Sequence, residues 1–309
     1  MNYETMQSVK SIETEAKQFM IAIVAPDKNT TAWVKAINDI APEISVSVWP
    51  EVDPSATLLL CWNPPEDTFV RLPNVKAIYV MGAGTDVVEA HPDLPDDIPI
   101  ERLTTHQLAS DMFDYVFHCL ETWRLQMHEY GQSTDWTPLP YRQRNDLHVT
   151  VMGLGHIGAY VAKQLFDSGY QAKGWSRSLK SLENIQTFAG PEQLIDAVSH
   201  SDALICLLSL NNDTRDILDH ALLSSLNPRS CLINVARGEH LVEQDLLQAL
   251  SGPLEHAFLD VFRTEPLPAE HPFWHNRSIS VTPHIASLTD PSSAAADVVN
   301  YYRSLKNDV

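Results

Sequence analysis

The chain has 309 residues, of which 44% are hydrophobic and 20% are charged, a balance typical of a folded globular protein with about two domains. Its 21 Lys and Arg residues against 40 Asp and Glu residues give a formal net charge of −19 at pH 7. A surface this acidic repels a phosphate backbone and argues against a nucleic-acid-binding protein. An anionic substrate must therefore be attracted by a local cluster of basic groups.

Targeting and membrane segments are not recognisable in the sequence. Residues 1–17 are polar, unlike a signal peptide, and predict an extension or an additional helix. The longest apolar runs, such as 19–25 and 203–208, are far shorter than the about 20 residues of a transmembrane helix. We expect a soluble, cytoplasmic protein that does not bind a membrane.

Four cysteines lie far apart, without a CxxC pair or the spacing of metal ligands. Each of them lies in or beside an apolar stretch: Cys61, Cys119, Cys206 and Cys231. This placement favours buried free thiols in a reducing compartment, and no metal site is expected.

Short apolar runs alternate with helix-like segments from residue 19 onward. Strands are expected at 19–25, 45–49, 57–61 and 75–80, and a helix at 30–41. Such a βα alternation is typical of a parallel sheet covered by helices. Residues 107–130 contain neither Gly nor Pro and predict one long helix, which an irregular segment follows at 135–146.

A second series of strands begins at His148. The expected strands are 148–153, 171–176, 203–208, 230–235, 256–261 and 278–281, with helices at 156–168, 191–199, 219–226 and 242–251. Six parallel strands in two βαβαβ halves form the doubly wound dinucleotide-binding arrangement, the Rossmann fold. A last helix, 291–305, is expected to pack on the first domain. The predicted division is a discontinuous substrate domain, 1–104 plus 286–309, and a nucleotide-binding domain, 105–285.

Residues Gly153-Leu154-Gly155-His156-Ile157-Gly158 form a GxGxxG motif between a predicted strand and a predicted helix. Gly153 permits a tight turn, Gly155 lets the backbone approach a pyrophosphate, and Gly158 lets the helix pack closely on the strand. The pyrophosphate then meets free N–H groups at the positive end of the helix dipole. The alternative is a glycine-rich turn that binds nothing.

The end of the next strand indicates which dinucleotide is bound. NAD sites usually place Asp or Glu there to accept hydrogen bonds from the ribose. Here Ser176 stands at that position, followed by Arg177, Ser178 and Lys180. A guanidinium pairs with a 2′-phosphate, and hydroxyls can donate to it. The sequence predicts NADP(H) in preference to NAD(H); the alternative is a solvated basic turn that merely lacks an acid.

Three ionisable residues, Arg237, Glu265 and His284, follow the ends of the last three predicted strands. Since ligands of such sheets bind outside the carboxyl ends of the strands, these side chains should lie at one edge. The set suits the reduction of a 2-oxo acid: Arg237 would hold the substrate carboxylate and polarise the carbonyl, and His284 would donate the proton. Glu265, paired with His284, would favour the imidazolium. Taken singly, each could instead be a capping, turn or solvated residue.

Three segments resemble the D-isomer-specific 2-hydroxyacid dehydrogenase family: NVARGEHLVEQDLLQAL (234–250), LDVFRTEPLP (259–268) and VTPHIAS (281–287). Other segments are most similar to its glyoxylate/hydroxypyruvate reductase A type, namely LLLCWNPP (58–65), VMGAGTD (80–86), WTPLP (136–140), GWSRS (174–178) and FAGPEQL (188–194). The resemblance implies a Rossmann domain inserted in a flavodoxin-like substrate domain. It also implies NADPH-dependent reduction of glyoxylate or hydroxypyruvate by a homodimer, with contacts mainly from the nucleotide domain and residues 105–145.

The resemblance further implies roles for single residues. The family's catalytic arginine, glutamate and histidine fall on Arg237, Glu265 and His284. Asp260 matches an aspartate that helps to hold the nicotinamide carboxamide. The substrate-binding residues implied are Ala83 and Gly84, through their backbone N–H groups, and Trp62, for which a hydrophobic anchor in the core is the alternative. The further cofactor-binding residues implied are His156, Ile157, Leu208, Ser209, Val235, Ala236 and Ala286.

Ser209 departs from the family pattern, because it stands where the family usually has proline. This departure predicts a looser cofactor loop.

Two other functions stay open: a dehydrogenase for another D-2-hydroxy acid such as D-lactate, and a non-catalytic dinucleotide-sensing protein. The joint presence of Arg237, Glu265 and His284 favours an enzyme, because a sensor needs no proton donor.

Overall fold

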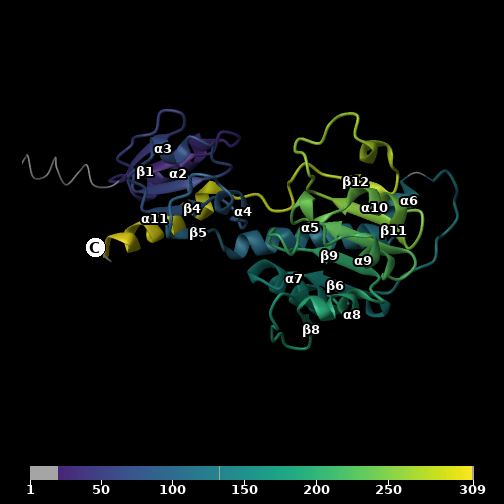
Figure 1. The fold of residues 1–309 in the computed structure, drawn as a ribbon. Helices are drawn as coiled ribbons and strands as arrows, with labels where there is room; N and C mark the ends of the chain where they lie inside the picture. Colours follow the sequence, from purple (N-terminus) through teal and green to yellow (C-terminus); the bar gives the residue numbers. More distant parts are fainter. Residues whose placement is uncertain (1–19, 132, 308–309) are drawn as a thin grey trace, which may run out of the picture. The chain divides into compact units, whose positions relative to one another are not determined.

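The computed structural model describes residues 20–131 and 133–307, drawn as a ribbon in Figure 1. The chain forms two compact units, which divide between Thr105 and His106 and between Leu288 and Thr289. Within the described ranges, no helix is both long enough and apolar enough to cross a lipid bilayer. The extension predicted for residues 1–17 lies outside the described residues.

The described part of the first unit contains a five-stranded parallel sheet with the order β2-β1-β3-β4-β5. Its strands are β1 (Met20–Val24), β2 (Ser45–Val48), β3 (Leu58–Cys61), β4 (Ala77–Val80) and β5 (Ile100–Arg102). The apolar strands β1, β3 and β4 are almost entirely buried, as expected for strands with helices over both faces. The sequence does not predict β5, whose three residues are partly exposed. This strand order is the flavodoxin-like one, and it reverses between β1 and β3.

The C-terminal helix α11 (Pro291–Asn307) belongs to this first unit, as the sequence predicts. It packs against α2 (Thr30–Ile40), and the shorter helices of the unit are α3 (Thr68–Arg71) and α4 (Asp86–Glu89). The hydroxyl of Tyr302 lies 3.5 Å from that of Thr57, and the ring of Tyr301 lies 5.3 Å from the ring of Tyr79. The described residues before and after the second unit therefore build one discontinuous unit.

The second unit contains a seven-stranded parallel sheet among its described residues, with the order β12-β11-β10-β9-β6-β7-β8. The strands are β6 (His148–Met152), β7 (Gln171–Ser176), β8 (Gln186–Ala189), β9 (Ala203–Cys206), β10 (Ser230–Asn234), β11 (Leu254–Leu259) and β12 (Ile279–Val281). The order reverses between β6 and β9, which pair directly. This arrangement confirms the predicted doubly wound fold and adds one strand, β8, to the six expected.

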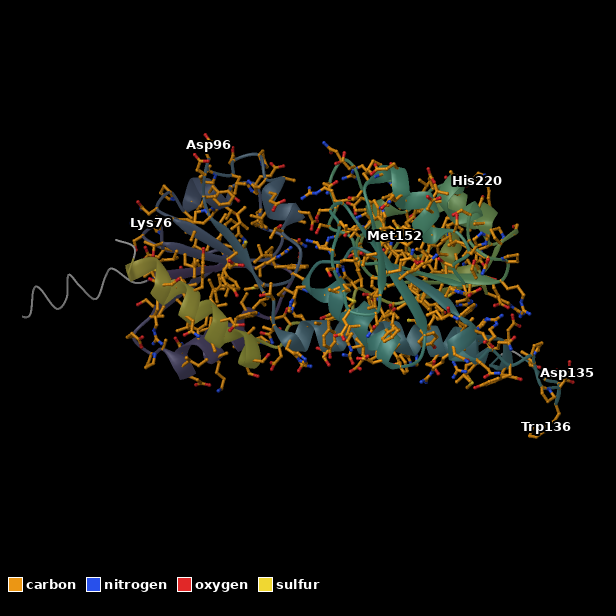
Figure 2. The ribbon with its side chains drawn as sticks, turned by 90° about the horizontal axis from the view of Figure 1, so that it is seen from below. Lys76, Asp96, Asp135, Trp136, Met152 and His220 are labelled. Carbon is orange, nitrogen blue, oxygen red and sulfur yellow. The ribbon has the colours of Figure 1, made fainter. Side chains whose placement is uncertain are left out.

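Helices cover both faces of this sheet: α5 (His106–Arg124), α6 (Met127–Tyr130), α7 (His156–Asp167), α8 (Leu194–Val198), α9 (His220–Ser224) and α10 (Glu243–Ala249). Successive strand residues alternate between the two apolar clusters, so Val151 packs with α5 and α7 while Met152 packs with α9 and α10. Figure 2 shows Met152 among the side chains of this interior. The four cysteines are free and buried, as the sequence predicts.

The single helix predicted for 107–130 is wrong, because the helix breaks after Arg124. Gln126 adopts the left-handed conformation with φ of 57°, and α6 starts again at Met127. The side chain of Gln126 is buried, and its amide donates a hydrogen bond of 2.6 Å to the carbonyl of Pro140. A tertiary contact therefore overrides the helix propensity of this segment.

Candidate active site

Two glycines of the GxGxxG segment are required by close packing. Gly153 has φ of 98°, and a Cβ there would lie 2.4 Å from the carbonyl oxygen of Leu207. A Cβ on Gly158 would lie 1.8 Å from the carbonyl oxygen of Gly153, so α7 could not approach the end of β6. These two positions therefore exclude any side chain whether or not a ligand binds.

Gly155 differs, because a Cβ added at this position would have no other atom within 4 Å. It is the N-cap residue of α7, and both Gly155 and His156 are exposed. The first N–H groups of a helix have no partner within the helix and carry the positive end of its dipole. The open space before α7 therefore fits the diphosphate of a dinucleotide, which the backbone can approach only where no side chain intervenes.

The turn after β7 carries cations and hydroxyls instead of an acid. Ser176 is buried at the end of the strand, and its hydroxyl donates a 2.8 Å hydrogen bond to the carbonyl of Ser178. Arg177, Ser178 and Lys180 are exposed beyond it. The hydroxyl of Thr187 on β8 donates to the carbonyl of Lys180 and ties the turn to the sheet. β8, which the sequence does not predict, therefore supports the cationic turn after β7, which the sequence does identify.

The loop after β9 contains Leu208 and Ser209 and is held by a threonine. The hydroxyl of Thr214 donates a 2.8 Å hydrogen bond to the carbonyl of Ser209, and the same hydroxyl accepts one of 2.9 Å from the N–H of Asn211. These bonds restrain the loop although it lacks the family's proline. Beside it, Val235 and Ala236 are buried after β10.

Arg237 follows β10 and lies in a turn with several hydrogen bonds. Its N–H donates to Nδ1 of His240 at 3.2 Å, and its guanidinium donates to the carbonyl of Ala236 at 2.7 Å. A Cβ on the next residue, Gly238, would lie 1.9 Å from the carbonyl carbon of Phe262. The turn after β10 is therefore packed directly against the turn after β11.

Asp260 is buried directly after β11, with 1% of its surface exposed. Its carboxylate accepts hydrogen bonds from the Thr282 hydroxyl at 2.6 Å and from the N–H groups of Ile285 and Ala286, both at 2.8 Å. Its backbone carbonyl accepts another, of 2.9 Å, from the N–H of His284. Asp260 therefore bonds to four positions of the segment after β12, namely 282 and 284–286.

Glu265 and His284 form the pair that the sequence predicts, with 2.8 Å between a carboxylate oxygen of Glu265 and Nδ1 of His284. The other carboxylate oxygen accepts a 2.9 Å hydrogen bond from the N–H of Phe262. Burial by itself raises the pKa of the Glu265 carboxyl. The hydrogen bonds from His284 and Phe262 and the charge of Arg237 outweigh burial and leave that pKa below its ordinary value.

The three ends of β10, β11 and β12 thus bring a guanidinium, a carboxylate and an imidazole to one edge of the sheet. The turns that carry Arg237 and Glu265 are in contact, because a Cβ on Gly238 would lie 1.9 Å from the carbonyl carbon of Phe262. A carboxylate at Nδ1 leaves Nε2 of the imidazole as the nitrogen that can give or take a proton. Among residues 20–131 and 133–307, no group of three His, Cys, Asp or Glu side chains is arranged to hold a metal ion.

The first unit places Trp62, Ala83 and Gly84 after the carboxyl ends of β3 and β4. Trp62 is half-buried: a Cβ on Gly82 would lie 2.5 Å from its ring, and Nζ of Lys28 lies 4.9 Å from the ring centre. The carbonyl of Ala83 accepts a 3.1 Å hydrogen bond from Arg102, at the end of β5. Two cations therefore lie along the edge that carries this loop, on an otherwise acidic protein.

Reasoning from the sequence misses several residues that support the site. Thr282 and His240 lie within three residues of a predicted site residue, so inspection of the strand ends could find them. Tyr115, whose hydroxyl lies 2.5 Å from that of Thr282, stands in the middle of α5 without a local signal. Lys28 follows a predicted strand and could be found by the same rule as Arg237, whereas Arg102 ends β5, which the sequence does not predict.

A sequence profile of the D-isomer specific 2-hydroxyacid dehydrogenase NAD-binding domain matches residues 117–286, more than half of the chain. The chain belongs to this family. It is 37% identical to glyoxylate/hydroxypyruvate reductase A of Serratia proteamaculans, over 87% of this chain and 89% of the relative. The same enzyme of Escherichia fergusonii is 36% identical, over 88% and 90%. The predicted resemblance is confirmed, and the dehydrogenase family identifies the chain as an NAD(P)-dependent oxidoreductase.

Solved structures of this dehydrogenase family have the same fold. A D-isomer specific 2-hydroxyacid dehydrogenase from Xanthobacter autotrophicus Py2, in complex with NADPH and MES, superposes with a TM-score of 0.90 at 31% identity and covers 94% of this chain and 96% of its own. An NADPH-dependent glyoxylate/hydroxypyruvate reductase from Sinorhizobium meliloti, in complex with NADP and sulfate, gives 0.88 at 28% identity, with coverage of 94% and 96%.

Proposed function

We propose that this dehydrogenase reduces small 2-oxo acids with NADPH, converting glyoxylate to glycolate and hydroxypyruvate to D-glycerate. The observation that carries the proposal is the 2.8 Å contact between Glu265 and His284, beside Arg237, at the carboxyl ends of adjacent strands. The names of the relatives from Serratia proteamaculans and Sinorhizobium meliloti support this substrate class.

His284 is the proposed proton donor. When bound, NADPH supplies the hydride that reaches the carbonyl carbon of the substrate. Glu265 accepts the hydrogen bond of Nδ1–H and stabilises the imidazolium, so the proton on Nε2 is the one given to the carbonyl oxygen. After the transfer, Nδ1 keeps its proton and the imidazole keeps its orientation.

Arg237 is the residue that we propose binds the substrate carboxylate and polarises the substrate carbonyl. Its guanidinium is held by the carbonyl of Ala236 and lies close enough to influence Glu265, and it can pair with the substrate carboxylate while polarising the carbonyl. In the first unit, we assign the backbone N–H groups of Ala83 and Gly84 to the binding of a substrate carboxylate and Trp62 to the wall of a substrate pocket. Lys28 and Arg102 counteract the overall negative charge there.

The proposed cofactor preference is NADP(H), with NAD(H) as the alternative. Ser176 stands where an NAD site has an acid, and the exposed Arg177, Ser178 and Lys180 that follow it suit a 2′-phosphate. Gly155 leaves room for the diphosphate. The other cofactor contacts that we propose are Gly153, His156, Ile157, Gly158, Ser176, Leu208, Ser209, Val235, Ala236, Asp260 and Ala286.

A homodimer is the proposed assembly, built on the segment 125–141, which we call the arm. Its large apolar side chains are exposed: Leu125, Met127, Tyr130, Trp136, Leu139 and Tyr141. Figure 2 shows Asp135 and Trp136 at the tip of the arm, away from the rest of their unit. An exposed apolar group of this size is typical of a protein–protein interface, and a second copy of the chain is the partner that the family resemblance implies.

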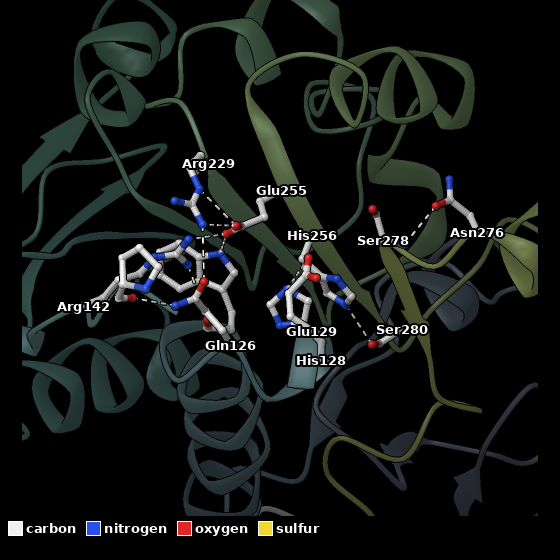
Figure 3. A network of polar contacts seen from close by, with 12 residues as sticks. Gln126, His128, Glu129, Arg142, Arg229, Glu255, His256, Asn276, Ser278 and Ser280 are labelled. Carbon is white, nitrogen blue, oxygen red and sulfur yellow. Dashed lines mark hydrogen bonds and ion pairs between the residues drawn. The ribbon is translucent and has the colours of Figure 1, made fainter. Parts of the chain in front are cut away.

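The base of the arm is anchored by a polar network, drawn in Figure 3. Glu255 on β11 accepts hydrogen bonds of 2.5 Å from Arg142 and 2.7 Å from Arg229. The ring of His128 lies 4.5 Å from that of His256, next to Glu255. An arm fixed at both of its ends presents its apolar side chains at lower entropic cost than a free loop would.

The cytoplasm is the proposed location of the enzyme. The four buried free thiols suit a reducing compartment. Burial raises the pKa of the Cys61 and Cys206 thiols to about 12, so neither is present as the reactive thiolate at neutral pH.

A reductase assay tests the proposed reaction. We expect the purified protein to oxidise NADPH, followed at the nicotinamide absorbance band, with glyoxylate and with hydroxypyruvate. His284→Ala should lower kcat about 10²–10⁴-fold while NADPH affinity, measured by fluorescence, stays within about twofold. Absence of turnover with every 2-oxo acid would refute the proposal, and a clear preference for pyruvate would favour the alternative D-lactate dehydrogenase.

Arg177→Ala tests the cofactor preference. Loss of a charge-assisted hydrogen bond to the 2′-phosphate should raise the KM for NADPH about tenfold or more and leave the KM for NADH unchanged. Lys163→Ala is the matched control, because Lys163 is a cation of the same unit that pairs with Asp167 on α7. Equal effects of Arg177→Ala on both cofactors would show that the turn does not recognise the phosphate.

Glu265→Gln tests the pairing with His284 through the pH dependence of reduction. The carboxyl of Glu265 has a lowered pKa, so it is ionised at neutral pH and stabilises the imidazolium until the pH falls through that lowered pKa. The amide lacks this charge and therefore stabilises the proton-donating form of His284 less. We expect the alkaline limb of the pH profile of kcat to move to lower pH. An unchanged limb would show that the pairing of Glu265 with His284 plays no part in the mechanism.

Trp136→Ala tests the proposed dimer. Light scattering should give about twice the 34.6 kDa of one chain for the unmodified protein and a shift toward one chain for the variant. Trp274→Ala is the control, because Trp274 is an exposed tryptophan outside the arm. A monomer in the unmodified protein, or equal masses for all three proteins, would contradict the proposal.

A further inference from the structure

A chain of hydrogen bonds runs from the middle of α5 to the segment that carries His284. The hydroxyl of Tyr115 lies 2.5 Å from the hydroxyl of Thr282, which lies 2.6 Å from the carboxylate of Asp260. Because a carboxylate can only accept hydrogen bonds, Thr282 donates its single hydroxyl proton to Asp260. Tyr115 must then donate to Thr282, so the hydrogen bonds run from Tyr115 through Thr282 to Asp260.

The far end of this chain sets the backbone around His284. Asp260 accepts the N–H groups of Ile285 and Ala286 through its carboxylate and the N–H of His284 through its carbonyl. His284 has φ of 55°, in the left-handed region that a residue with a side chain rarely adopts. Such a conformation persists only where the surrounding structure imposes it. The hydrogen bonds to Asp260 impose it here.

Thr282 is the one side chain that joins Asp260 to α5 in this chain of bonds. Its hydroxyl and the N–H of Ile285 share the same carboxylate oxygen, so the hydroxyl determines how the carboxylate is turned toward the loop. Tyr115 in turn restricts the hydroxyl, and its ring packs against the apolar core of the unit. Burial raises the pKa of the Tyr115 phenol well above its ordinary value, so the phenol remains a donor.

We propose that Tyr115 and Thr282 are positioning residues of the reductase, which orient Asp260 and, through it, hold the imidazole of His284 in place for proton transfer. This inference rests on the proposed function, since it assigns the geometry of the proposed donor to two residues outside the proposed catalytic and binding residues. Reacting groups must be held to a fraction of an ångström, and supporting hydrogen bonds provide that restraint.

Thr282→Val and Thr282→Ser form the central comparison. Valine has the shape of threonine without a hydroxyl, whereas serine keeps the hydroxyl and loses a methyl group. We expect Thr282→Val to lower kcat about tenfold, with the KM for the 2-oxo acid changed by less than about threefold. Thr282→Ser should retain kcat within about twofold. Tyr115→Phe, which keeps the ring, should give a smaller loss of about threefold.

A measurement on the protein without substrate or cofactor separates this inference from the proposed function. Hydrogen exchange at the amides of Ile285 and Ala286 should become faster in Thr282→Val than in the unmodified protein or in Thr282→Ser. If the unmodified protein reduces no 2-oxo acid but this difference is found, the proposed function fails and the positioning stands. If the exchange rates are equal, the positioning fails even when the reductase is active.

Two further outcomes would also overturn the inference. One is a Thr282→Val protein with normal kcat. The other is a Thr282→Ser protein that loses as much activity as Thr282→Val, because the methyl group and not the hydroxyl would then matter. A purely structural role would lower the melting temperature of Thr282→Val without separating kcat from KM.

Discussion

The buried carboxylate of Asp260 is the interaction on which the geometry of the site depends. It lies at the end of β11, in the middle of the three strand ends that carry Arg237, Glu265 and His284, and it is bonded to three donors from the neighbouring turn. Together with the bond from the N–H of His284 to the carbonyl of Asp260, these bonds help to hold His284 in a left-handed backbone conformation. The family resemblance assigns the same carboxylate to the cofactor, so the proposed cofactor contact and the proposed orientation of His284 both depend on this one residue.

The framework of both sheets could be predicted from the sequence because apolar runs mark buried parallel strands. The ends of those strands then locate Arg237, Glu265 and His284 without any tertiary information, since parallel strands present their carboxyl ends at one edge. β8 is not predicted in this way, because its residues are only partly buried and do not form an apolar run. It nevertheless supports the cationic turn at Arg177 through the hydroxyl of Thr187.

The features that could not be predicted depend on contacts between distant parts of the chain. The helix break at Gln126 reflects a buried side-chain amide that reaches the carbonyl of Pro140, and no local residue signals it. The bond between Tyr115 and Thr282 joins positions that are 167 residues apart. Thr282 lies beside a predicted site residue, but Tyr115 gives no signal of this link, because a tyrosine in an amphipathic helix is equally typical of a packed core. Their function becomes visible only when the hydrogen bonds are followed atom by atom.

The contrast between the glycines of the loop before α7 has an evolutionary consequence. Backbone conformation and packing require glycine at 153 and 158, whereas position 155 has room for a side chain and an ordinary φ of −71°. Selection for a folded chain alone therefore leaves position 155 free to drift. A lineage that abandoned its dinucleotide would lose that glycine first and keep the other two, so the residue at 155 records whether a descendant still uses the nucleotide.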